Sequence, residues 1–361
     1  MKKHNYSAGP CILPQEVFEK SAQAILNFNN SGLSILEISH RSKDFVAVMD
    51  EARSLALELL GLEGKGYQAL FLHGGASLAF LMVPNNLMKI NGKAAYLDSG
   101  TWASTAIKGA KSFGEAVVVA SSKADKYSYV PKDYEIPSDV DYFHFTSNNT
   151  IYGTQMKTIP NVNVPLVCDM SSDIFSRELD FSKFDLIYAG AQKNMGPAGT
   201  TLVVVKESIL GKTGREIPDF LNYQVHIDKE SMANTPAVFS VYATLLTLQW
   251  LKKQGGIAGI EKINNAKANL LYSEIDRNPY FTGLAKAEDR SNMNATFKLV
   301  NEEHTGVFDA LWKEAGINGI TGYRTLGGYR ASMYNALPLE SVQVLVDVMQ
   351  DFETKVNEIE I

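Results

Sequence analysis

The sequence predicts an α/β fold in which a large, mostly parallel β-sheet is flanked by helices and followed by a smaller α+β unit. Up to about residue 235 the chain alternates short apolar segments with helical patterns, and several of these segments are continuously apolar. Continuously apolar strands are typical of parallel sheets that are buried on both faces. After residue 235 the pattern changes to longer helices. The expected strands of the sheet lie at 69–72, 116–120, 141–146, 164–168, 185–189 and 201–205.

The helix expected at 43–60 is the clearest of those that precede or separate these strands. Val48, Ala52, Leu55 and Leu59 recur at helical spacing and would form one apolar face. Because an amphipathic helix buries such a face against a neighbouring layer, we expect this helix to cover one side of the sheet.

A long helix is expected after residue 234, and we expect it to bridge the two units. Thr235 would be its N-cap, with Pro236 at the first helical position. The helix would continue to about Gln254, because Gly255 and Gly256 follow and end it.

The change of pattern predicts two domains, as the length of 361 residues also suggests. A large α/β domain would occupy 15–255 and a small α+β domain 256–361, with residues 1–14 packing near the functional site or the small domain. The small domain is expected to contain helices at 257–276 and 304–315, strands at 293–300 and 328–335, and a terminal helix from Pro338.

Composition excludes several classes of protein. Hydrophobic residues make up 45% of the chain and charged residues 20%, which excludes a disordered or collagen-like chain. The net charge of −6 argues against a nucleic-acid or membrane-surface partner. There are only two cysteines, no signal peptide at the N-terminus, and no apolar run of the roughly 18 residues that a membrane span needs. We therefore expect a cytoplasmic protein, and without a metal, because histidines and cysteines lack metal-site spacing.

A glycine-rich turn at 73–77 follows a predicted strand and precedes a helical pattern. Small residues at such a turn allow backbone N–H groups to bind a phosphate at the helix N-terminus, although an ordinary tight turn requires the same glycines. The turn lacks the spacing of a dinucleotide fingerprint. The segment from Gly211 to Thr213 is not a P-loop either, because Lys206 stands where the first glycine is needed. Neither a dinucleotide nor an ATP site is expected.

Asp169 and Lys193 come at the ends of two successive predicted strands, where ligands bind in open α/β sheets. Asp169 would be either a helix cap or the carboxylate that keeps a cofactor nitrogen protonated. Lys193 would be either a solvated lysine or a buried amine whose lowered pKa makes it a nucleophile for a Schiff base. The small residues between Gly190 and Gly199 leave room for a planar ligand.

Trp102 and several arginines complete the set of candidates. Trp102 lies near a strand end, where its indole would pack in the core or stack on an aromatic cofactor. Arg41 follows His40, and Arg324 and Arg330 flank a pair of glycines. Arginine suits bidentate recognition of carboxylate and phosphate, whereas surface pairing is the ordinary role of any single one. Together these cations favour an anionic substrate.

Several motifs occur in a fixed order along the chain: Ser7-Ala8-Gly9-Pro10 with Leu13-Pro14, Ser39-His40-Arg41, His73-Gly74-Gly75, Tyr188-Ala189-Gly190-Ala191-Gln192-Lys193-Asn194 with Gly196-Pro197-Ala198-Gly199, and Arg330-Ala331-Ser332 with Tyr334-Asn335-Ala336. With these motifs the sequence resembles the phosphoserine aminotransferases, a family of class V pyridoxal-phosphate enzymes. The resemblance extends from residue 5 to the C-terminus. It implies the type I fold of pyridoxal-phosphate transferases, a cofactor-binding large domain and a homodimer with shared active sites.

The resemblance also implies pyridoxal 5'-phosphate as the cofactor. Lys193 would form the Schiff base and move the proton between the substrate Cα and C4′ of the cofactor, while Asp169 would pair with the pyridine nitrogen. Trp102 would stack on the ring, and Thr150 would hydrogen-bond its phenolic oxygen. The cofactor phosphate would be bound by Ala76, Ser77 and Gln192, and by Asn234 and Thr235 of the partner subunit.

The implied reaction is a ping-pong transamination in serine biosynthesis. Glutamate would give its amino group to the cofactor and leave as 2-oxoglutarate, and 3-phosphohydroxypyruvate would then become O-phosphoserine. A second reaction, which forms 4-phosphohydroxythreonine for pyridoxine biosynthesis, is also implied. His40 and Arg41 would bind an acidic group of the substrate, Arg330 its α-carboxylate, and Arg324 would assist with the distal anion.

Two departures from the family pattern concern the substrate anion. Ala76-Ser77 stands where many members carry Gly-Arg, and Tyr323 stands where a histidine is often found. The arginine would assist the distal phosphate or carboxylate, so its absence affects how the substrate is held.

Other functions remain as alternatives. Another class V reaction would use a different amino donor or acceptor, or be a lyase or cysteine desulfurase. A desulfurase needs a cysteine on a mobile loop, whereas Cys11 is N-terminal and Cys168 ends a predicted buried strand. A non-catalytic small-molecule-binding protein would not need Lys193 and Asp169. A nicotinamide-dependent oxidoreductase would need a glycine fingerprint that the chain lacks.

Overall fold

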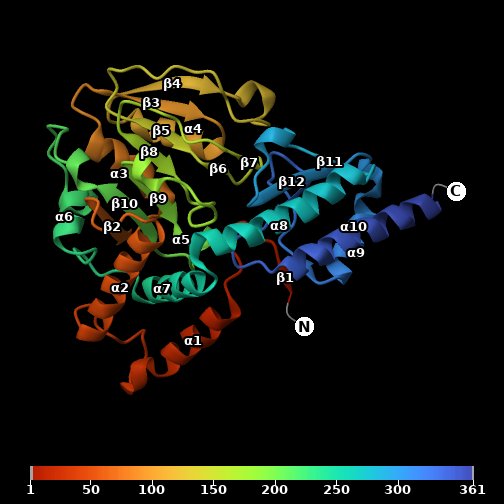
Figure 1. Cartoon of the computed structure of the whole chain (residues 1–361), viewed down its shortest axis with the longest axis horizontal. Helices are drawn as coiled ribbons and strands as arrows, with labels where there is room; N and C mark the ends of the chain where they lie inside the picture. Colours follow the sequence, from red (N-terminus) through yellow and green to blue (C-terminus); the bar gives the residue numbers. More distant parts are fainter. Residues whose placement is uncertain (1–2, 360–361) are drawn as a thin grey trace.

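The main feature of the computed structural model, which describes residues 3–359, is a seven-stranded sheet with helices on both faces (Figure 1). The strand order is β2-β10-β9-β8-β5-β3-β4. Only β10 runs against its neighbours, pairing antiparallel with both β2 and β9. The predicted large, mostly parallel sheet is confirmed. Its strands are β2 (Tyr67–Leu72), β3 (Lys93–Asp98), β4 (Glu115–Ser121), β5 (Phe143–Thr146), β8 (Leu166–Asp169), β9 (Leu186–Gly190) and β10 (Thr201–Lys206).

One strand of this sheet, β3, is absent from the sequence prediction. Its first residues include Ala94 and Ala95, which have low strand propensity and do not form a recognisable apolar run. In the fold β3 pairs with β4 on one side and β5 on the other, and both alanines are completely buried. Tertiary pairing, and not local propensity, therefore makes this strand.

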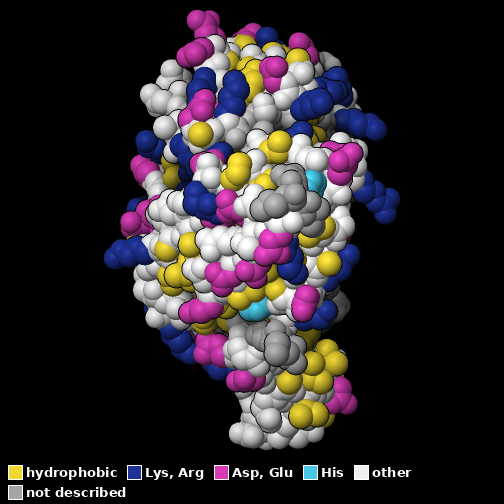
Figure 2. Space-filling view, turned by 90° about the vertical axis from the view of Figure 1, so that its right-hand side faces the viewer, with side chains coloured by type: hydrophobic (Ala, Val, Ile, Leu, Met, Phe, Trp, Pro, Cys, Tyr) yellow, Lys and Arg dark blue, Asp and Glu magenta, His cyan; other side chains and the backbone are white. Residues whose placement is uncertain are grey.

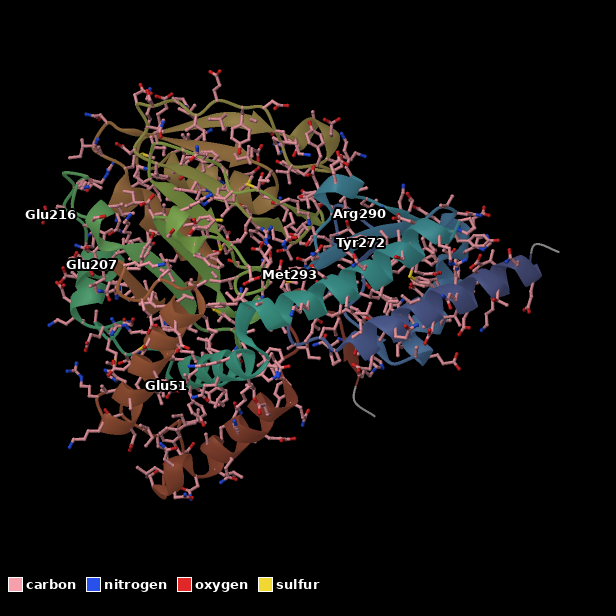
Figure 3. All side chains as sticks on the ribbon, viewed as in Figure 1. Glu51, Glu207, Glu216, Tyr272, Arg290 and Met293 are labelled. Carbon is pink, nitrogen blue, oxygen red and sulfur yellow. The ribbon has the colours of Figure 1, made fainter. Side chains whose placement is uncertain are left out.

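Alternate residues of the strands face two apolar cores. In β2, Ala69 and Phe71 face the core that α2 and α7 cover, while Leu70 and Leu72 face the core beneath α3, α4 and α6. The helices α2 and α7 also join at their surface, where Gln249 donates to Glu51 at 2.6 Å (Figure 3). No helix within residues 3–359 is long and apolar enough to cross a membrane. These helices are α2 (Lys43–Leu59), α3 (Gly75–Leu87), α4 (Thr101–Ala110), α6 (Tyr223–Asp228) and α7 (Val238–Lys253).

The start of α7 corrects the sequence prediction. The helix begins at Val238 with Ala237 as its N-cap, so Thr235 is not the N-cap and Pro236 is not in the first turn. The carbonyl of Thr235 is bonded instead to Nε2 of His73, at 2.8 Å. Because that carbonyl has an outside partner, the helix starts two residues later than predicted.

The helix that we expected to bridge the two units is α7, and this prediction is wrong. The helix that connects the units is α8 (Gly256–Arg277). Those apolar residues of α7 that belong to a hydrophobic core all belong to the core of the large sheet. In α8, Ile257 and Ile260 belong to that core, whereas Leu271 and Ile275 belong to a separate one. Gly255, with a φ of +88°, provides the left-handed turn between α7 and α8, as predicted.

The second core lies under a three-stranded antiparallel sheet of order β11-β12-β14, against which α8, α9 and α10 pack (Figure 1). The N-terminal segment joins this unit through the parallel pair β1–β13, and Tyr6 and Ile12 are buried in its core. Arg290 stacks over the ring of Tyr272 at 4.9 Å (Figure 3). The remaining elements are α1 (Gln15–Leu26), α9 (Thr305–Glu314), α10 (Leu339–Ile359), β1 (His4–Asn5), β6 (Asn148–Asn149), β7 (Thr154–Gln155), β11 (Phe281–Gly283), β12 (Asn294–Leu299), β13 (Ile317–Asn318) and β14 (Tyr329–Ser332).

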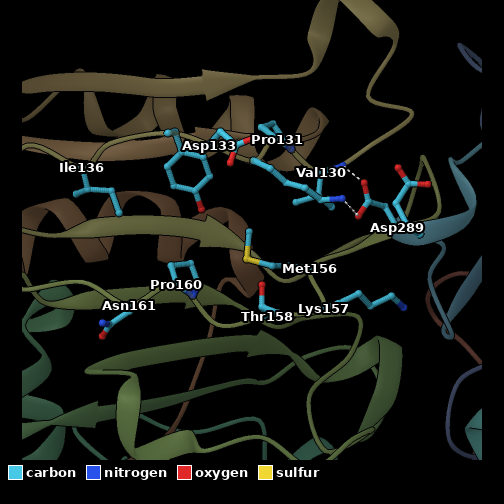
Figure 4. A pocket seen from close by; sticks show the side chains of 13 residues that line it. Val130, Pro131, Asp133, Ile136, Met156, Lys157, Thr158, Pro160, Asn161 and Asp289 are labelled. Carbon is cyan, nitrogen blue, oxygen red and sulfur yellow. Dashed lines mark hydrogen bonds and ion pairs between the residues drawn. The ribbon is translucent and has the colours of Figure 1, made fainter.

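A pocket of about 500 Å³ lies between the segments 130–136 and 156–161, and Glu288 and Asp289 of the C-terminal unit also line it (Figure 4). Lys132 forms an ion pair with Asp289 at 3.2 Å, and the Asp289 carboxylate also accepts from the N–H of Val130 at 3.0 Å. None of the residues that line this pocket is a predicted site residue.

Candidate active site

The carboxyl ends of the parallel strands bring most of the predicted site residues to one edge of the large sheet. Asp169 is the last residue of β8, and Lys193 lies one turn after the end of β9. Trp102 is in the first turn of α4, directly after β3, and Thr150 directly follows the short strand β6, which comes after β5. Because parallel strands end at the same edge, four residues that are far apart in sequence become neighbours.

Lys193 is held at the centre of this group. It belongs to the single-turn helix α5 (Ala191–Asn194), and its Nζ donates to Oγ1 of Thr150 at 2.9 Å. The same Nζ lies 5.8 Å from the centre of the Trp102 ring. Burial lowers the pKa of the Lys193 amine, the negative charge of Asp169 opposes that shift, and the positive charge of Arg330 adds to it. An amine with a lowered pKa is the nucleophile that captures a carbonyl carbon.

Asp169 is a buried carboxyl, 4% exposed, beside this amine. Its Oδ1 accepts from the N–H of Ser171 at 2.9 Å. Burial raises the pKa of the Asp169 carboxyl, whereas the charge of Lys193 and the bonds from Ser171 lower it. A buried carboxylate in this position stabilises a positive charge on any group placed against it.

The glycine turn opens α3 without a side-chain cap. Gly74 has a φ of +88°, and among the described residues no side chain caps this helix. The first helical bond runs from the N–H of Leu78 to the carbonyl of Gly74, so the N–H groups before Leu78, those of Ala76 and Ser77 among them, have no intrahelical acceptor. Such free donors at the positive end of a 13-residue helix fit a phosphate group. This finding favours the phosphate interpretation of the turn over an ordinary tight turn.

Asn234 and Thr235 lie against this turn within the same chain, because Nε2 of His73 bonds the Thr235 carbonyl at 2.8 Å. The side chain of Thr235 is exposed, and that of Asn234 is half-buried. Gln192 lies nearer to Lys193, and its carbonyl accepts from the N–H of Cys11 at 3.1 Å.

Arg330, on β14, brings the C-terminal unit to the group. One of its terminal nitrogens donates to the carbonyl of Thr150 at 3.4 Å. Its Nε is buried and has no hydrogen-bond partner among the described residues. A buried, unpartnered guanidinium nitrogen is costly unless a ligand satisfies it, so Arg330 fits an anionic substrate group.

The other three predicted substrate residues are not joined to this group in the single chain. Arg41 and Arg324 are exposed, and His40 is half-buried. Within residues 3–359 none of the three side chains makes a hydrogen bond or an ion pair with Lys193, Asp169 or any other residue.

The N-terminal segment lies where residues 1–14 were expected, near the functional site and the small unit, but Gly9 and Cys11 were not among the predicted site residues. A Cβ on Gly9, whose φ is +146°, would lie 3.2 Å from Cγ of Lys193, so only glycine leaves the lysine side chain this space. The thiol of Cys11 donates to the main-chain carbonyl of Lys193. The Gly-Pro step in the N-terminal motif was the available signal for a close approach.

Cys11 therefore lies beside Lys193, as expected for the segment 1–14. Burial raises the pKa of the Cys11 thiol to about 12. Cys168 is completely buried in β8, where burial also raises the pKa of its thiol. Neither thiol has the thiolate character that a desulfurase requires, which weakens that alternative.

An amine poised to capture an aldehyde and a helix N-terminus that fits a phosphate follow β9 and β2, whose carboxyl ends share one edge of the sheet. Together they define the class of pyridoxal-phosphate-dependent enzymes, whose cofactor carries an aldehyde and a phosphate. The family model for class-V aminotransferases ("Aminotransferase class-V") matches residues 4–345, and the chain belongs to this class.

Within that class the similarity is to phosphoserine aminotransferases. The phosphoserine aminotransferase of Flavobacterium psychrophilum is 77% identical over 356 residues, which cover 99% of this chain and 100% of the relative. The structure of phosphoserine aminotransferase from Bacillus circulans subsp. alkalophilus is 41% identical, covers 98% of this chain and 99% of its own, and superposes with a TM-score of 0.94. The pyridoxal-phosphate-bound phosphoserine aminotransferase from Trichomonas vaginalis is 32% identical, with coverages of 97% and 100% and a TM-score of 0.92. The chain is thus a pyridoxal-phosphate-dependent transaminase of the phosphoserine aminotransferase family.

Proposed function

We propose that this enzyme transfers the amino group of glutamate to 3-phosphohydroxypyruvate, forming 2-oxoglutarate and O-phosphoserine in two half-reactions. The observation that carries the proposal is the double contact of Thr150: its hydroxyl accepts from Lys193 and its carbonyl accepts from Arg330. A guanidinium that can bind an α-carboxylate is thereby held next to the amine that handles the α-carbon. The name shared by the relatives supports phosphoserine as the amino acid that is made.

The chain's own residues divide the chemistry between them. Pyridoxal phosphate, when bound, supplies the aldehyde and a ring that stabilises negative charge at the substrate Cα. Lys193 removes and returns the proton at Cα, for which its lowered pKa suits it. Asp169 favours a protonated ring nitrogen because a buried carboxylate stabilises an adjacent cation. The Thr150 hydroxyl orients the amine, and Trp102 covers one side of it.

We assign binding of the cofactor phosphate to the N-terminus of α3. Ala76 and Ser77 would donate main-chain N–H groups, the Ser77 hydroxyl would add a further bond, and the side chain of Gln192 would complete the set. Asn234 and Thr235 of the partner subunit would reach the same phosphate.

Substrate recognition would use cations from different parts of the chain. Arg330 would bind the α-carboxylate that glutamate and phosphoserine share, while His40, Arg41 and Arg324 would bind the distal anion. Ser77 cannot replace the arginine that many family members carry, because its side chain is neutral. The distal anion therefore depends on side chains that make no hydrogen bond or ion pair with another residue in the described part of the chain.

We propose a homodimer in the cytoplasm as the working form, with the domain division at 255/256. Exposed apolar side chains gather on α1 and the segment after it, and the projecting end of the molecule carries this patch in Figure 2. Leu26 is 77% exposed and Leu36 64%, a few residues before His40 and Arg41. Covering this surface with a second copy would remove apolar area from water and bring those two cations to an interface. The other exposed members are Phe18, Ile25 and Leu33.

A substrate panel tests the proposal. Purified enzyme loaded with pyridoxal phosphate is incubated with 2-oxoglutarate and an amino donor, and glutamate formation is measured. We expect phosphoserine to be used at least one hundredfold more efficiently than serine, as kcat/KM. Equal use of serine would contradict the assignment of a distal anion site, and no glutamate from either donor would contradict the proposed amino acceptor.

A further inference from the structure

Three asparagines from distant parts of the chain bind three successive main-chain carbonyls. Through Nδ2, Asn194, Asn335 and Asn264 donate to the first, second and third carbonyl of the segment 174–176, at 2.5, 3.0 and 3.0 Å. We call these three residues the asparagine clasp. All three are buried, with exposures of 7%, 4% and 1% in the same order. An ordinary turn satisfies its carbonyls locally or with water, so three buried amides on one short segment are a specific arrangement.

The members of the clasp are also bonded to one another. The N–H of Asn335 donates to Oδ1 of Asn194 at 2.9 Å. Nδ2 of Asn264 donates to Oδ1 of Asn335 at 2.8 Å. Asn335 is therefore the central member, since it contacts both other asparagines and the segment 174–176. A continuous chain of amides runs from α5, through the segment that follows β14, to α8.

Three of the four segments that the clasp joins adjoin a group of the active site, and α8 is the fourth segment. The segment 174–176 follows β8, which ends at Asp169, and Asn194 is the residue after Lys193. Asn335 comes shortly after Arg330 on β14. The clasp thus connects the carboxylate, the amine and the guanidinium through buried hydrogen bonds, although none of its members contacts those three side chains.

Helix α8 holds the clasp from the side of the C-terminal unit. Lys267, one turn after Asn264, donates to the carbonyls of Met333 and Tyr334 at 3.1 and 2.8 Å. These two carbonyls would otherwise continue the strand, which explains why β14 stops at Ser332 when the sequence predicted it to 335. These bonds fix the main chain that leads into Asn335. A substitution that changes the side-chain amide of Asn335 therefore displaces its partners on the side of Lys193.

We propose that Asn335 is a positioning residue for amino transfer, which through the clasp sets the distance between Arg330 and Lys193. The inference rests on the proposed binding of the α-carboxylate by Arg330. A substrate anchored by Arg330 presents its Cα to Lys193 only at one separation, and a displacement of about 1 Å can cost roughly one hundredfold in rate. Loss of the clasp therefore lowers the rate of proton transfer more than it lowers substrate affinity.

The test uses two nearly isosteric variants and a matched control. Asn335→Asp keeps the acceptor for Asn264 but places an oxygen against the second carbonyl of 174–176. Asn194→Asp keeps the acceptor for the N–H of Asn335 but loses the donor to the first carbonyl. The control is Asn265→Ala, on the same helix, where the side chain is exposed and bonds Asn292 instead.

We expect kcat per cofactor-loaded site to fall tenfold to one hundredfold in Asn335→Asp, for glutamate and phosphoserine alike, with KM changed less than about threefold. The pH midpoint of the visible absorption band of the cofactor-loaded protein should also move, because the charges around Lys193 shift. Asn194→Asp should behave in the same way, and it carries the test if Asn335→Asp fails to fold. Asn265→Ala should change none of these quantities.

The inference is overturned if the folded clasp variants lose thermal stability but keep both kcat per loaded site and the pH midpoint of the band. It is also overturned if KM rises while kcat is unchanged, because that pattern means that the substrate and the transition state are bound more weakly to the same extent. A wild-type enzyme that makes no glutamate from phosphoserine refutes the proposed function instead. In that case the pH midpoint alone, which needs no substrate, decides on the clasp.

Discussion

The cofactor side and the substrate side of this active site are built differently. On the cofactor side, Lys193, Asp169 and Thr150 are at least partly buried, and each has a hydrogen-bond partner in its own chain. On the substrate side, Arg41 and Arg324 are exposed, and their side chains have no such partner among the described residues. Groups that chemistry requires at a fixed separation are preorganised, whereas groups that hold a mobile anion gain their partners when the substrate and the second subunit arrive.

The largest expected effect on the cofactor side comes from removing the Lys193 amine. Lys193→Ala should lower kcat by roughly 10⁴-fold or more, because the variant loses both the nucleophile and the proton carrier. The measurement is glutamate formation together with the visible absorbance of the bound cofactor. Lys206→Ala, which removes a lysine from the opposite edge of the sheet, should leave both unchanged. Retention of activity in Lys193→Ala would place the reacting amine elsewhere.

A smaller loss is expected when the buried carboxylate is neutralised. Asp169→Asn keeps the shape of the side chain but removes its charge, and breaking a buried charge interaction costs about 3–5 kcal/mol, or roughly 10²- to 5 × 10³-fold in kcat. Stopped-flow measurement of each half-reaction checks this. Asp185→Asn is the control, because Asp185 lies at the other end of β8, where its Oδ2 accepts from the N–H of Leu166 at 2.9 Å. A control that lost as much kcat as Asp169→Asn would indicate general damage to the sheet.

Substitutions of the two arginines of the C-terminal unit should differ in effect, because Arg330 is partly buried in the site and Arg324 is exposed. Arg330→Ala removes a buried cation that both amino acids would use, so kcat/KM should fall about 10- to 100-fold for glutamate and phosphoserine alike. Arg324→Ala removes an exposed cation, so the loss should stay below about tenfold and affect mainly phosphoserine. Steady-state kinetics with both donors measures the pair. An effect of Arg330→Ala on only one donor would contradict a shared α-carboxylate site.

Much of the cofactor side could be predicted because it follows strand ends. Asp169 and Lys193 stand directly after apolar runs that are recognisable in the sequence, and parallel pairing then brings them together. Gly9 and Cys11 could not be placed in this way, since no strand carries them to the site. The pair β1–β13 folds the N-terminus back over Lys193, and nothing local in the sequence specifies that long-range contact.

The elements that were missed or misplaced depend on tertiary contacts as well. The alanines of β3 give no strand signal, and the start of α7 is set by a bond between His73 and Thr235, residues far apart in sequence. The same holds for the clasp, because an asparagine in a helix or after a strand is ordinarily a surface residue. Local patterns therefore predicted the large sheet and the residues on its edge, and long-range hydrogen bonds determined what positions them.

The smallest expected effect concerns the pH at which Lys193 captures its cofactor. In the apoenzyme, burial lowers the pKa of Lys193, Asp169 and, less strongly, Asp173 and Cys11 raise it, and Arg330 lowers it. Only the neutral amine reacts, so Asp169→Asn should move the pH midpoint of covalent pyridoxal-phosphate binding downward and Arg330→Gln should move it upward, each by up to about one unit. Rapid-mixing absorbance across a pH series measures both midpoints. If both midpoints shifted in the same direction, packing and not the charges of Asp169 and Arg330 would set the pKa of Lys193. The preorganisation of the cofactor side would then depend on burial alone.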